Sequence, residues 1–471
     1  MNAMLHIQRE EAMRKNAVPE QFLLLLAGVH ALLFTACVAA QPGPAEEPEL
    51  TAYLGGAVLD IQNGDWREGA IILVRGELIE AVLEAGSTIP DEASVNDMTG
   101  HFAVPGLIDV HQHYAVGPPI DFALMIANRA IHGGVTTARD MAGDTRIIAY
   151  LARQTRLGEV AGPDIYFAAL MAGPSFLEDR RMAASRVGID RSRAPWIQGI
   201  TRGTDLAQAV AMARGTGATG VKVYGNLGPD LVAAIITETH RQGLQAWLHG
   251  AVFPTTPADG AAAGADTLSH ICMLAYQSQQ PAPASYAYID RPDLDEEGLM
   301  AGRYDEQMQA LYAVLRKRGT IIDTTLYVYP TIERMRARLG DNGPPIYCST
   351  DLAAYIAADA HRAGVRFATG TDAWSPTEEE WPALISELEL LRDRAAMAPI
   401  EILRAATVIA AEAIGQENEL GRIDPGKLAN ITFFSSDPLA PDANLRTVAL
   451  TVKRGRQYWR SDYVHRAPEA P

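Results

Sequence analysis

The chain has 471 residues, of which 48% are hydrophobic and 21% are charged, and its formal net charge at pH 7 is −17. This length exceeds what one small core needs, so we expect one large domain and one smaller domain in a soluble globular protein. The acidic balance argues against nucleic-acid binding, which requires a basic face, and it favours solubility and, to a small extent, cationic substrates.

Residues 1–40 are predicted to be an export signal rather than part of the fold. Two basic residues precede an apolar segment from Phe22 to Ala40, and a proline-rich linker over residues 41–49 follows. The stretch that ends at Cys37 resembles a bacterial lipoprotein cleavage site, which predicts a lipid anchor to the membrane through that cysteine. Cleavage after Ala40 and an uncleaved membrane span are the alternatives. All three place the protein outside the cytoplasm, in the periplasm, on the cell envelope or secreted.

Residues 50–103 and 418–460 have the pattern of short strands separated by turns. Because terminal segments of a domain often meet, we expect one small β-sandwich-like domain built from both pieces. The predicted strands are Tyr53–Asp60, Ala70–Val74, Leu78–Leu83, Ala429–Ser435 and Val448–Val452.

Residues 104–417 alternate β-like runs with helical runs, which predicts a parallel sheet. Eight such units over about 270 residues fit an α/β fold of the (β/α)8 (TIM) barrel type. The predicted strands are Leu107–Val110, Gly134–Asp140, Ile165–Ala169, Gly220–Tyr224, Gln245–His249, Thr267–His270, Thr320–Thr325 and Val365–Asp372. The predicted helices are Asp121–Ile131, Ile147–Leu157, Leu206–Arg214, Asp230–Gln242, Asp305–Arg318, Thr350–Ala363, Leu384–Arg394 and Pro399–Ala413.

Two histidines, His111 and His113, end the first barrel strand in the run Val-Pro-Gly-Leu-Ile-Asp-Val-His-Gln-His-Tyr. Side chains two residues apart on a strand point to the same face, so both imidazoles can bind one metal ion. The spacing alone fits two histidines in a polar loop equally well.

Four more polar residues end later barrel strands: Lys222 the fourth, His249 the fifth, His270 the sixth and Asp372 the eighth. Taken singly, a lysine can extend to solvent, a histidine can be satisfied in a core and an aspartate can cap a helix. Barrel enzymes carry their chemistry at the carboxyl ends of the strands. The joint pattern therefore predicts a metal site.

Together these residues resemble the metal-dependent amidohydrolase superfamily. The resemblance rests on Pro-Gly-Leu-Ile-Asp-x-His-x-His, Gly-Val-Thr-Thr-x-Arg-Asp, Thr-Gly-Thr-Asp-Ala and the strand-forming tail Leu-Gly-Arg-Ile-Asp-Pro-Gly-Lys-Leu-Ala-Asn. It extends from about Leu50 to Tyr458 and departs from the family at Asn430, where an aspartate is usual. Lys222 and the Gly-Val-Thr-Thr-x-Arg-Asp run look most similar to the dipeptidase and imidazolonepropionase-like branch.

The resemblance implies two divalent metal ions. His111, His113 and Asp372 would hold the more buried ion, and His249 and His270 the more exposed one. Lys222, carboxylated by carbon dioxide, would bridge the two ions through its carbamate. Imidazole and carboxylate ligands favour zinc, with manganese, iron and cobalt as alternatives.

Asp372 would act as the catalytic acid and base on a metal-bridged hydroxide. Asp109 either orients a ligand or is a turn residue at the strand end. Tyr224, Asn226, Tyr327 and Trp374 follow barrel strands and are predicted to contact substrate. Arg139 and Asp140 would pair with each other or meet substrate.

The three cysteines show no Cys-x-x-Cys spacing, so the sequence predicts neither a disulfide framework nor a thiolate zinc site, and Cys272 is expected to be core packing. The function implied by the resemblance is hydrolysis of carbon–nitrogen bonds, for example in dipeptides or N-acyl amino acids. Hydrolysis of esters, lactones or phosphotriesters on the same site is the main alternative. A deaminase and a non-catalytic binding or scaffold barrel are the others.

Overall fold

The computed structural model describes residues 49–115, 120–179, 181–189, 194–286, 291–373 and 379–466. The predicted signal segment, Cys37 and nearly all of the predicted linker lie outside these residues, so their roles stay predictions. Within the described ranges, no helix has both the length and the apolar character needed to cross a membrane.

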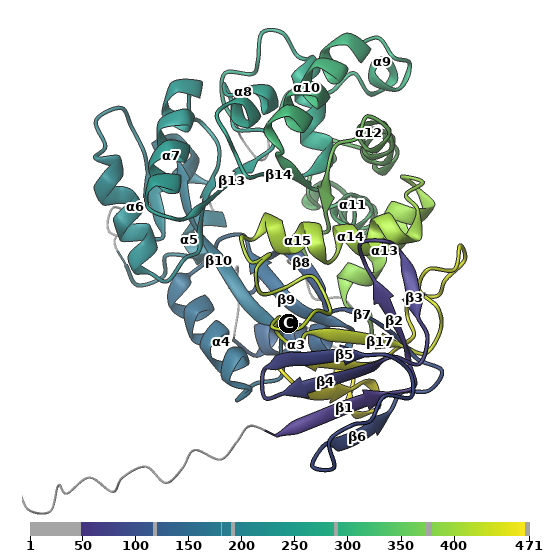
Figure 1. The fold of residues 1–471 in the computed structure, drawn as a ribbon. Coiled ribbons are helices and arrows are strands. Elements are labelled where there is room, and N and C mark those ends of the chain that lie inside the picture. Colours follow the sequence, from purple (N-terminus) through teal and green to yellow (C-terminus); the bar gives the residue numbers. More distant parts are fainter. Residues whose placement is uncertain are drawn as a thin grey trace, which may run out of the picture. The chain divides into compact units, whose positions relative to one another are not determined.

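Eight parallel strands form a nearly closed barrel, which confirms the predicted (β/α)8 fold (Figure 1). The ends of the sheet approach each other where the Val110 amide donates to the Thr369 carbonyl at 2.9 Å and where Gln112 bridges to Ala373. In sheet order the strands are β8 (Leu107–Gln112), β9 (Val135–Asp140), β10 (Asp164–Ala172), β12 (Gly220–Val223), β13 (Gln245–His249), β14 (Thr267–Ser269), β15 (Ile321–Asp323) and β16 (Phe367–Ala368), with β11 (Ile197–Gly199) paired to β10.

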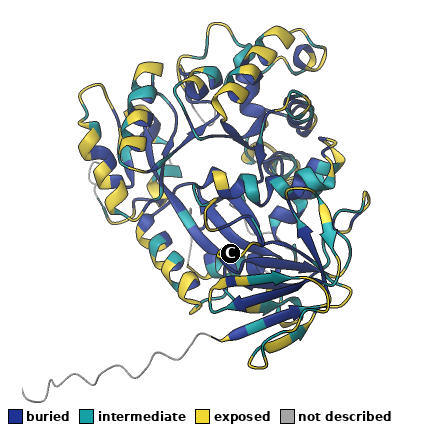
Figure 2. Cartoon of the chain, viewed as in Figure 1, coloured by how far each residue is buried: buried dark blue, intermediate teal, exposed yellow. Residues whose placement is uncertain are grey.

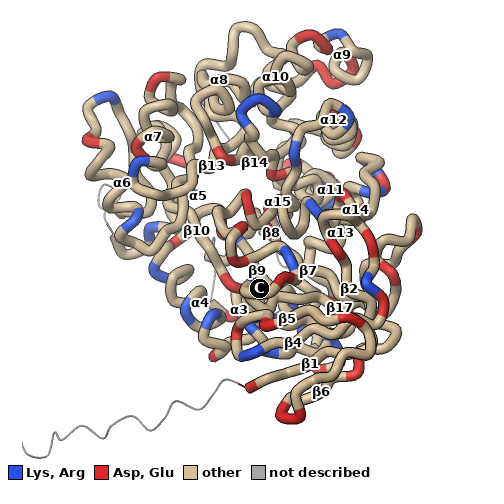
Figure 3. Tube along the Cα trace, viewed as in Figure 1, with Lys and Arg blue, Asp and Glu red and all other residues tan. Residues whose placement is uncertain are grey.

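The barrel strands are buried along nearly their whole length, whereas the helices outside them expose one face (Figure 2). This follows from the sequence, since parallel strands covered on both faces are almost continuously apolar. Helix α7 (Pro229–Arg241) buries Val232, Ile235, Ile236 and Thr239, the spacing of one helical face. In the view of Figure 3, acidic and basic segments are interspersed over these helices and loops.

The predicted helices are present, with one change. The run predicted as one helix over Pro399–Ala413 is two, because the backbone breaks at Thr407, whose φ is −132° and ψ is −87°. The helices are α3 (Ile120–His132), α4 (Thr145–Leu157), α6 (Leu206–Gly215), α7, α10 (Asp305–Arg318), α12 (Thr350–Arg362), α13 (Ala383–Asp393), α14 (Pro399–Ala405) and α15 (Val408–Ala413). Four were not predicted: α5 (Arg181–Ala184), α8 (Pro257–Ala262), α9 (Glu296–Met300) and α11 (Val328–Leu339).

Two further sheets come from the two ends of the described chain. The four-stranded sheet has the order β5 (Leu78–Leu83), β4 (Ile71–Arg75), β1 (Leu50–Leu54), β6 (Ser94–Asp97). The six-stranded sheet has the order β19 (Arg456–Trp459), β18 (Val448–Lys453), β17 (Ile431–Phe434), β7 (Phe102–Pro105), β2 (Ala57–Asp60), β3 (Asp65–Arg67). One buried cluster joins them, with the rings of Tyr53 and Phe433 5.3 Å apart.

Gly106 divides the small sheets from the barrel. Val104 and Pro105 end β7 in the six-stranded sheet, and β8 in the barrel begins at Leu107, directly after this glycine. A Cβ at Gly106 would lie 2.3 Å from the side-chain oxygen of Thr136, so this close approach requires a glycine. The predicted domain boundaries themselves stay a prediction.

The spacing of the cysteines predicts no disulfide framework, but one disulfide bond is present among the described residues. Cys272, in the 3-10 segment η2 (Ile271–Ser278), is bonded to Cys348, which directly precedes the N-cap of α12. The two cysteines are 76 residues apart in the sequence, and no spacing motif marks them. Packing of η2 against α12 brings their Cα atoms to 6.5 Å.

Candidate metal centre

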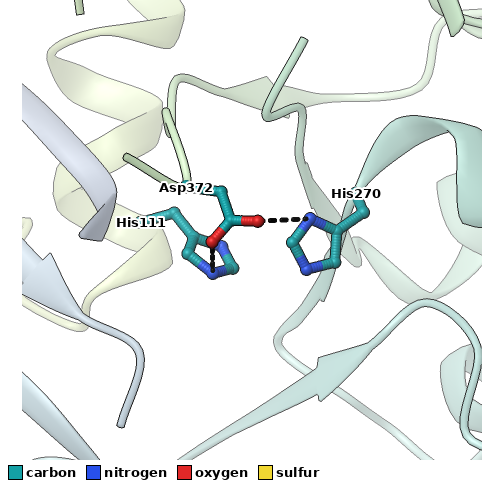
Figure 4. Close-up of side chains that lie close together, drawn as sticks. All are labelled: His111, His270 and Asp372. Carbon is teal, nitrogen blue, oxygen red and sulfur yellow. Dashed lines mark ion pairs between the residues drawn. The ribbon is translucent and has the colours of Figure 1, made fainter. Parts of the chain in front are cut away.

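The six predicted ligand residues gather at the carboxyl end of the barrel. His111 lies on β8, Lys222 on β12 and His249 on β13. His270 directly follows β14, and Asp372 lies in the segment after β16. One carboxylate oxygen of Asp372 lies 3.0 Å from Nε2 of His113 and 3.5 Å from Nε2 of His111. Its other oxygen lies 3.8 Å from Nδ1 of His270 (Figure 4).

The remaining two residues complete the cluster. Nζ of Lys222 lies 3.5 Å from Nε2 of His111, and the ring centroid of His249 lies 4.7 Å from that of His270. His111, His270 and Asp372 each offer a donor atom, and these three atoms all lie within 4.8 Å of one another. The sequence analysis assigned His270 to the ion held by His249, and His111 and Asp372 to the other ion. Because His270 lies close to His111 and Asp372, the two predicted metal positions are adjacent.

The electrostatics of the cluster suit a cation. Burial is the largest cause that lowers the pKa of His111, His249 and His270 well below the usual value, so all three imidazoles are neutral and can donate a lone pair. Burial would raise the pKa of Asp372, but the surrounding histidines outweigh it and hold that pKa low. Neutral imidazoles around a carboxylate are the ligand set of zinc and related ions.

Lys222 is buried among these groups. Burial lowers the pKa of its amine to about 8. An ammonium ion cannot ligate a cation, so a lysine at this position contributes to a metal site only when its amine is neutral or carboxylated. The lowered pKa increases the fraction of neutral amine near pH 7 to 8.

Asp323, at the end of β15, orients His111 and was not predicted. Its Oδ2 lies 2.6 Å from Nδ1 of His111 and accepts hydrogen bonds from Ser269 Oγ at 2.9 Å and Arg139 Nη2 at 3.1 Å. Because Nδ1 of His111 donates to this carboxylate, Nε2 is the nitrogen left for a metal. Arg139 is therefore paired with Asp323, and the prediction that it pairs with Asp140 or contacts substrate is wrong.

Asp109 ties the strand that carries His111 to the segment that carries Asp372. Its Oδ1 accepts from the backbone amides of His111 and Thr371, each at 3.1 Å, and its Oδ2 accepts from Thr371 Oγ1 at 2.8 Å. Burial raises the pKa of Asp109 to about 7. Of the two predicted roles, these contacts match a residue that positions ligands.

Two of the six candidate ligands have a left-handed backbone, with φ of 72° at His270 and 49° at Asp372. Thr325, whose Oγ1 lies 2.9 Å from Nδ1 of His270, has φ of 44°. Such backbone is uncommon outside glycine and costs about 1–3 kcal/mol per residue. The surrounding packing therefore holds these side chains in directions that an unconstrained chain would disfavour.

A cavity of about 1170 Å³ opens over the cluster and is lined by His113, Lys222, His249, His270 and Asp372. Tyr224 also lines it, and its ring stacks on His249 at 4.3 Å.

The other predicted substrate contacts are placed differently. Asn226 and Tyr327 are not among the described residues that line the cavity. Asn226 instead accepts from the backbone amide of Tyr286 at 2.6 Å and donates to Ser175 at 3.0 Å. Trp374 lies outside the described residues, so its role stays a prediction.

The cavity residues that were not predicted include Tyr286, Arg291 and Tyr347. They lie on the long connections around η2 and before α12, where no hydrophobic period marks them. Asp323 differs, because it ends an apolar run as the predicted ligands do, and the same argument would have found it.

The Amidohydrolase family model matches residues 102–457. The fold is similar to that of a Xaa-Pro dipeptidase solved with bound methionine, at 18% identity and a TM-score of 0.67 over 87% of this chain and all of that one. A. niger ochratoxinase (18% identity, TM-score 0.66, 88% and 96% covered) and molinate hydrolase (18%, 0.65, 90% and 100%) are similar as well. No curated protein matches the chain.

Proposed function

Because the chain belongs to the amidohydrolase family, we propose that it is an exported, metal-dependent hydrolase of carbon–nitrogen bonds in small molecules such as dipeptides or N-acyl amino acids. The observation that carries this proposal is the gathering of four histidines, Lys222 and Asp372 at the carboxyl end of a barrel, where all of them except the buried His111 line one cavity. This is the end at which barrel enzymes carry their chemistry.

The donor set fits two divalent ions, zinc being the natural choice for imidazole and carboxylate ligands. His111, His113 and Asp372 would hold one ion and His249 and His270 the other, with Lys222 as a carbamate between them. When bound, such ions lower the pKa of a water molecule and polarise a carbonyl group.

The chain's own residues position and move protons. Asp323 keeps the hydrogen of His111 on Nδ1, and Asp109 fixes the backbone on both sides of the site. The carboxylate of Asp372 faces the cavity and accepts the proton of the attacking water, which it then delivers to the leaving nitrogen.

The substrate class rests on analogy and on the shape of the site. A Xaa-Pro dipeptidase shares the fold, and its name describes cleavage of a peptide-like bond. The cavity is also large enough for a dipeptide-sized molecule, since ligand cavities commonly have about 300–1,000 Å³.

Export, with a lipid anchor at Cys37 or simple signal cleavage, is part of the same proposal. The bond between Cys272 and Cys348 supports it, because stable disulfides belong to oxidising compartments outside the cytoplasm.

The test is hydrolysis of a panel of dipeptides, N-acyl amino acids, esters, lactones and phosphotriesters by zinc- or manganese-loaded protein. His113→Asn and Asp372→Asn are the matched inactive variants, and Arg404→Gln, at a residue that is not among the described residues lining the cavity, is the control. Cleavage of amides lost in both variants and kept in the control supports the proposal. Cleavage of only esters or phosphotriesters would replace it, and no cleavage by any metal form would refute it.

A further inference from the structure

Arg291 forms part of the wall of the cavity that the candidate metal ligands also line. Its guanidinium carbon lies 3.5 Å from the ring centroid of Tyr347 and 4.6 Å from that of Tyr286, and its Nη2 donates to the hydroxyl of Tyr286. Contacts to two rings hold the guanidinium in place, and the burial of Arg291 is intermediate rather than complete. A fixed guanidinium that reaches a cavity is suited to binding a carboxylate through two parallel hydrogen bonds.

The ring of Tyr286 lies between Arg291 and the candidate metal ligand His249. The ring of Tyr286 lies 5.1 Å from that of His249, so a single aromatic ring separates the guanidinium from this ligand. The hydroxyl of Tyr286 also lies 3.4 Å from that of Tyr224, whose ring stacks on His249.

The position of Arg291 beside the candidate metal ligands matches the position of a terminal carboxylate beside the scissile carbonyl of a substrate. In a dipeptide or N-acyl amino acid, the scissile carbonyl and the terminal carboxylate are separated only by the amide nitrogen and the α-carbon. A substrate whose carbonyl lies at the metal cluster therefore carries its carboxylate to the neighbouring part of the wall. The wall also supplies apolar side chains that can contact the substrate's own apolar groups, namely Leu170, Phe176, Ile197, Val328 and Ile332.

We propose that Arg291, held by Tyr286 and Tyr347, binds the α-carboxylate of the leaving amino acid and makes the enzyme specific for amides that end in a free carboxylate. This inference rests on the proposed function and narrows it to substrates with a negatively charged leaving part. Arg291 is a specificity-determining residue, and it takes no part in the proton transfers.

A pair of substrates tests this subsite: N-acetylleucine, which has the carboxylate, and N-acetylleucinamide, in which a neutral amide replaces it. The steady-state kinetics of metal-loaded wild type are compared with those of Arg291→Gln and Arg291→Lys. Arg366→Gln is the matched control, because Arg366 is not among the described residues that line the cavity and is paired with Glu412 at 2.7 Å. Metal content and melting temperature show that each variant keeps the site and the fold.

We expect wild type to prefer N-acetylleucine, and Arg291→Gln to lower kcat/KM for it by at least about 30-fold, mainly through KM. The same variant should change kcat/KM for the amide by less than about threefold, and Arg291→Lys should retain an intermediate preference, since it keeps the charge but not the planar pair of donors. Arg366→Gln should leave kcat/KM for both substrates within about threefold of the wild-type value. Equal losses on both substrates, or no preference in wild type, would overturn the proposal.

Calorimetric binding of N-acetylleucine to metal-loaded Asp372→Asn, with and without Arg291→Gln, separates this inference from the proposed function. Binding that weakens with Arg291→Gln although wild type cleaves neither substrate would keep the carboxylate subsite and refute the hydrolase. Cleavage of both substrates without any effect of Arg291→Gln on binding would support the hydrolase and refute the carboxylate subsite.

Discussion

Replacing Asp323 by asparagine should weaken metal binding although Asp323 is not one of the candidate ligands. The carboxylate oxygen Oδ2 is the partner of Nδ1 of His111 at 2.6 Å, and both side chains are fully buried. An amide that turns its NH2 group toward His111 would favour hydrogen on Nε2, the nitrogen that must bind the metal. Loss of such an orienting partner typically weakens metal affinity by 10- to 100-fold, or about 1.4–2.8 kcal/mol.

The same change has a second, separable cost. Arg139 is fully buried and loses the charge of its partner, which costs about 3 kcal/mol or more in folding free energy. Arg139 keeps its hydrogen bond to the carbonyl of Ala413 at 3.1 Å and its contact with the ring of Trp247 at 4.6 Å. We therefore expect the loss of folding free energy to be close to about 3 kcal/mol. For a chain of this length, 3 kcal/mol corresponds to a melting temperature about 3 °C lower.

The assay is competition for zinc against a chelator, followed for wild type, Asp323→Asn and the control Asp341→Asn. Asp341 is exposed and pairs with Arg336, so its variant should bind zinc as wild type does. A zinc affinity of Asp323→Asn within threefold of wild type, in a folded protein, would refute the role given to Asp323.

Three further results are expected. Cys348→Ser, which opens a loop of 76 residues closed by Cys272, should lower the free energy of unfolding by about 4–5 kcal/mol, and a reductant should lower that of wild type equally but not that of the variant. Metal-free protein should regain its second zinc faster at pH 8 than at pH 7 when the concentration of dissolved carbon dioxide is held equal, because a Lys222 pKa of about 8 raises the neutral fraction of the amine from about one tenth to one half; equal rates would contradict this. Gly106→Ala should cost about 1–3 kcal/mol of stability, since its Cβ would collide with a threonine of β9, whereas Gly215→Ala, which has open space, should change it by less than about 0.5 kcal/mol.

The sequence was sufficient for the barrel because its signals are local. Each barrel strand is a short apolar run, and the carboxyl ends of parallel strands lie at one end of a barrel whatever the helices between them do. His111, Lys222 and His249 could therefore be placed together from their positions in such runs alone.

The unpredicted features depend on contacts between distant segments. The disulfide requires η2 to pack on α12, and nothing near Cys272 or Cys348 in the sequence encodes that packing. The loop that carries Tyr286 is fixed by the side chain of Asn226, 60 residues earlier, so its direction into the cavity has no local signal. Loops of this kind follow the scaffold, whereas strands and helices follow their own periodicity.

The most direct test of the account is the metal content of the purified protein, by elemental analysis, for wild type and Lys222→Ala. Wild type should contain close to two divalent ions per chain, and the variant, checked for folding by its melting curve, should contain fewer than one. One ion in both proteins would make Lys222 a bystander and remove the bridged pair. No ion in either, after loading with zinc or manganese, would contradict the metal-dependent hydrolase itself.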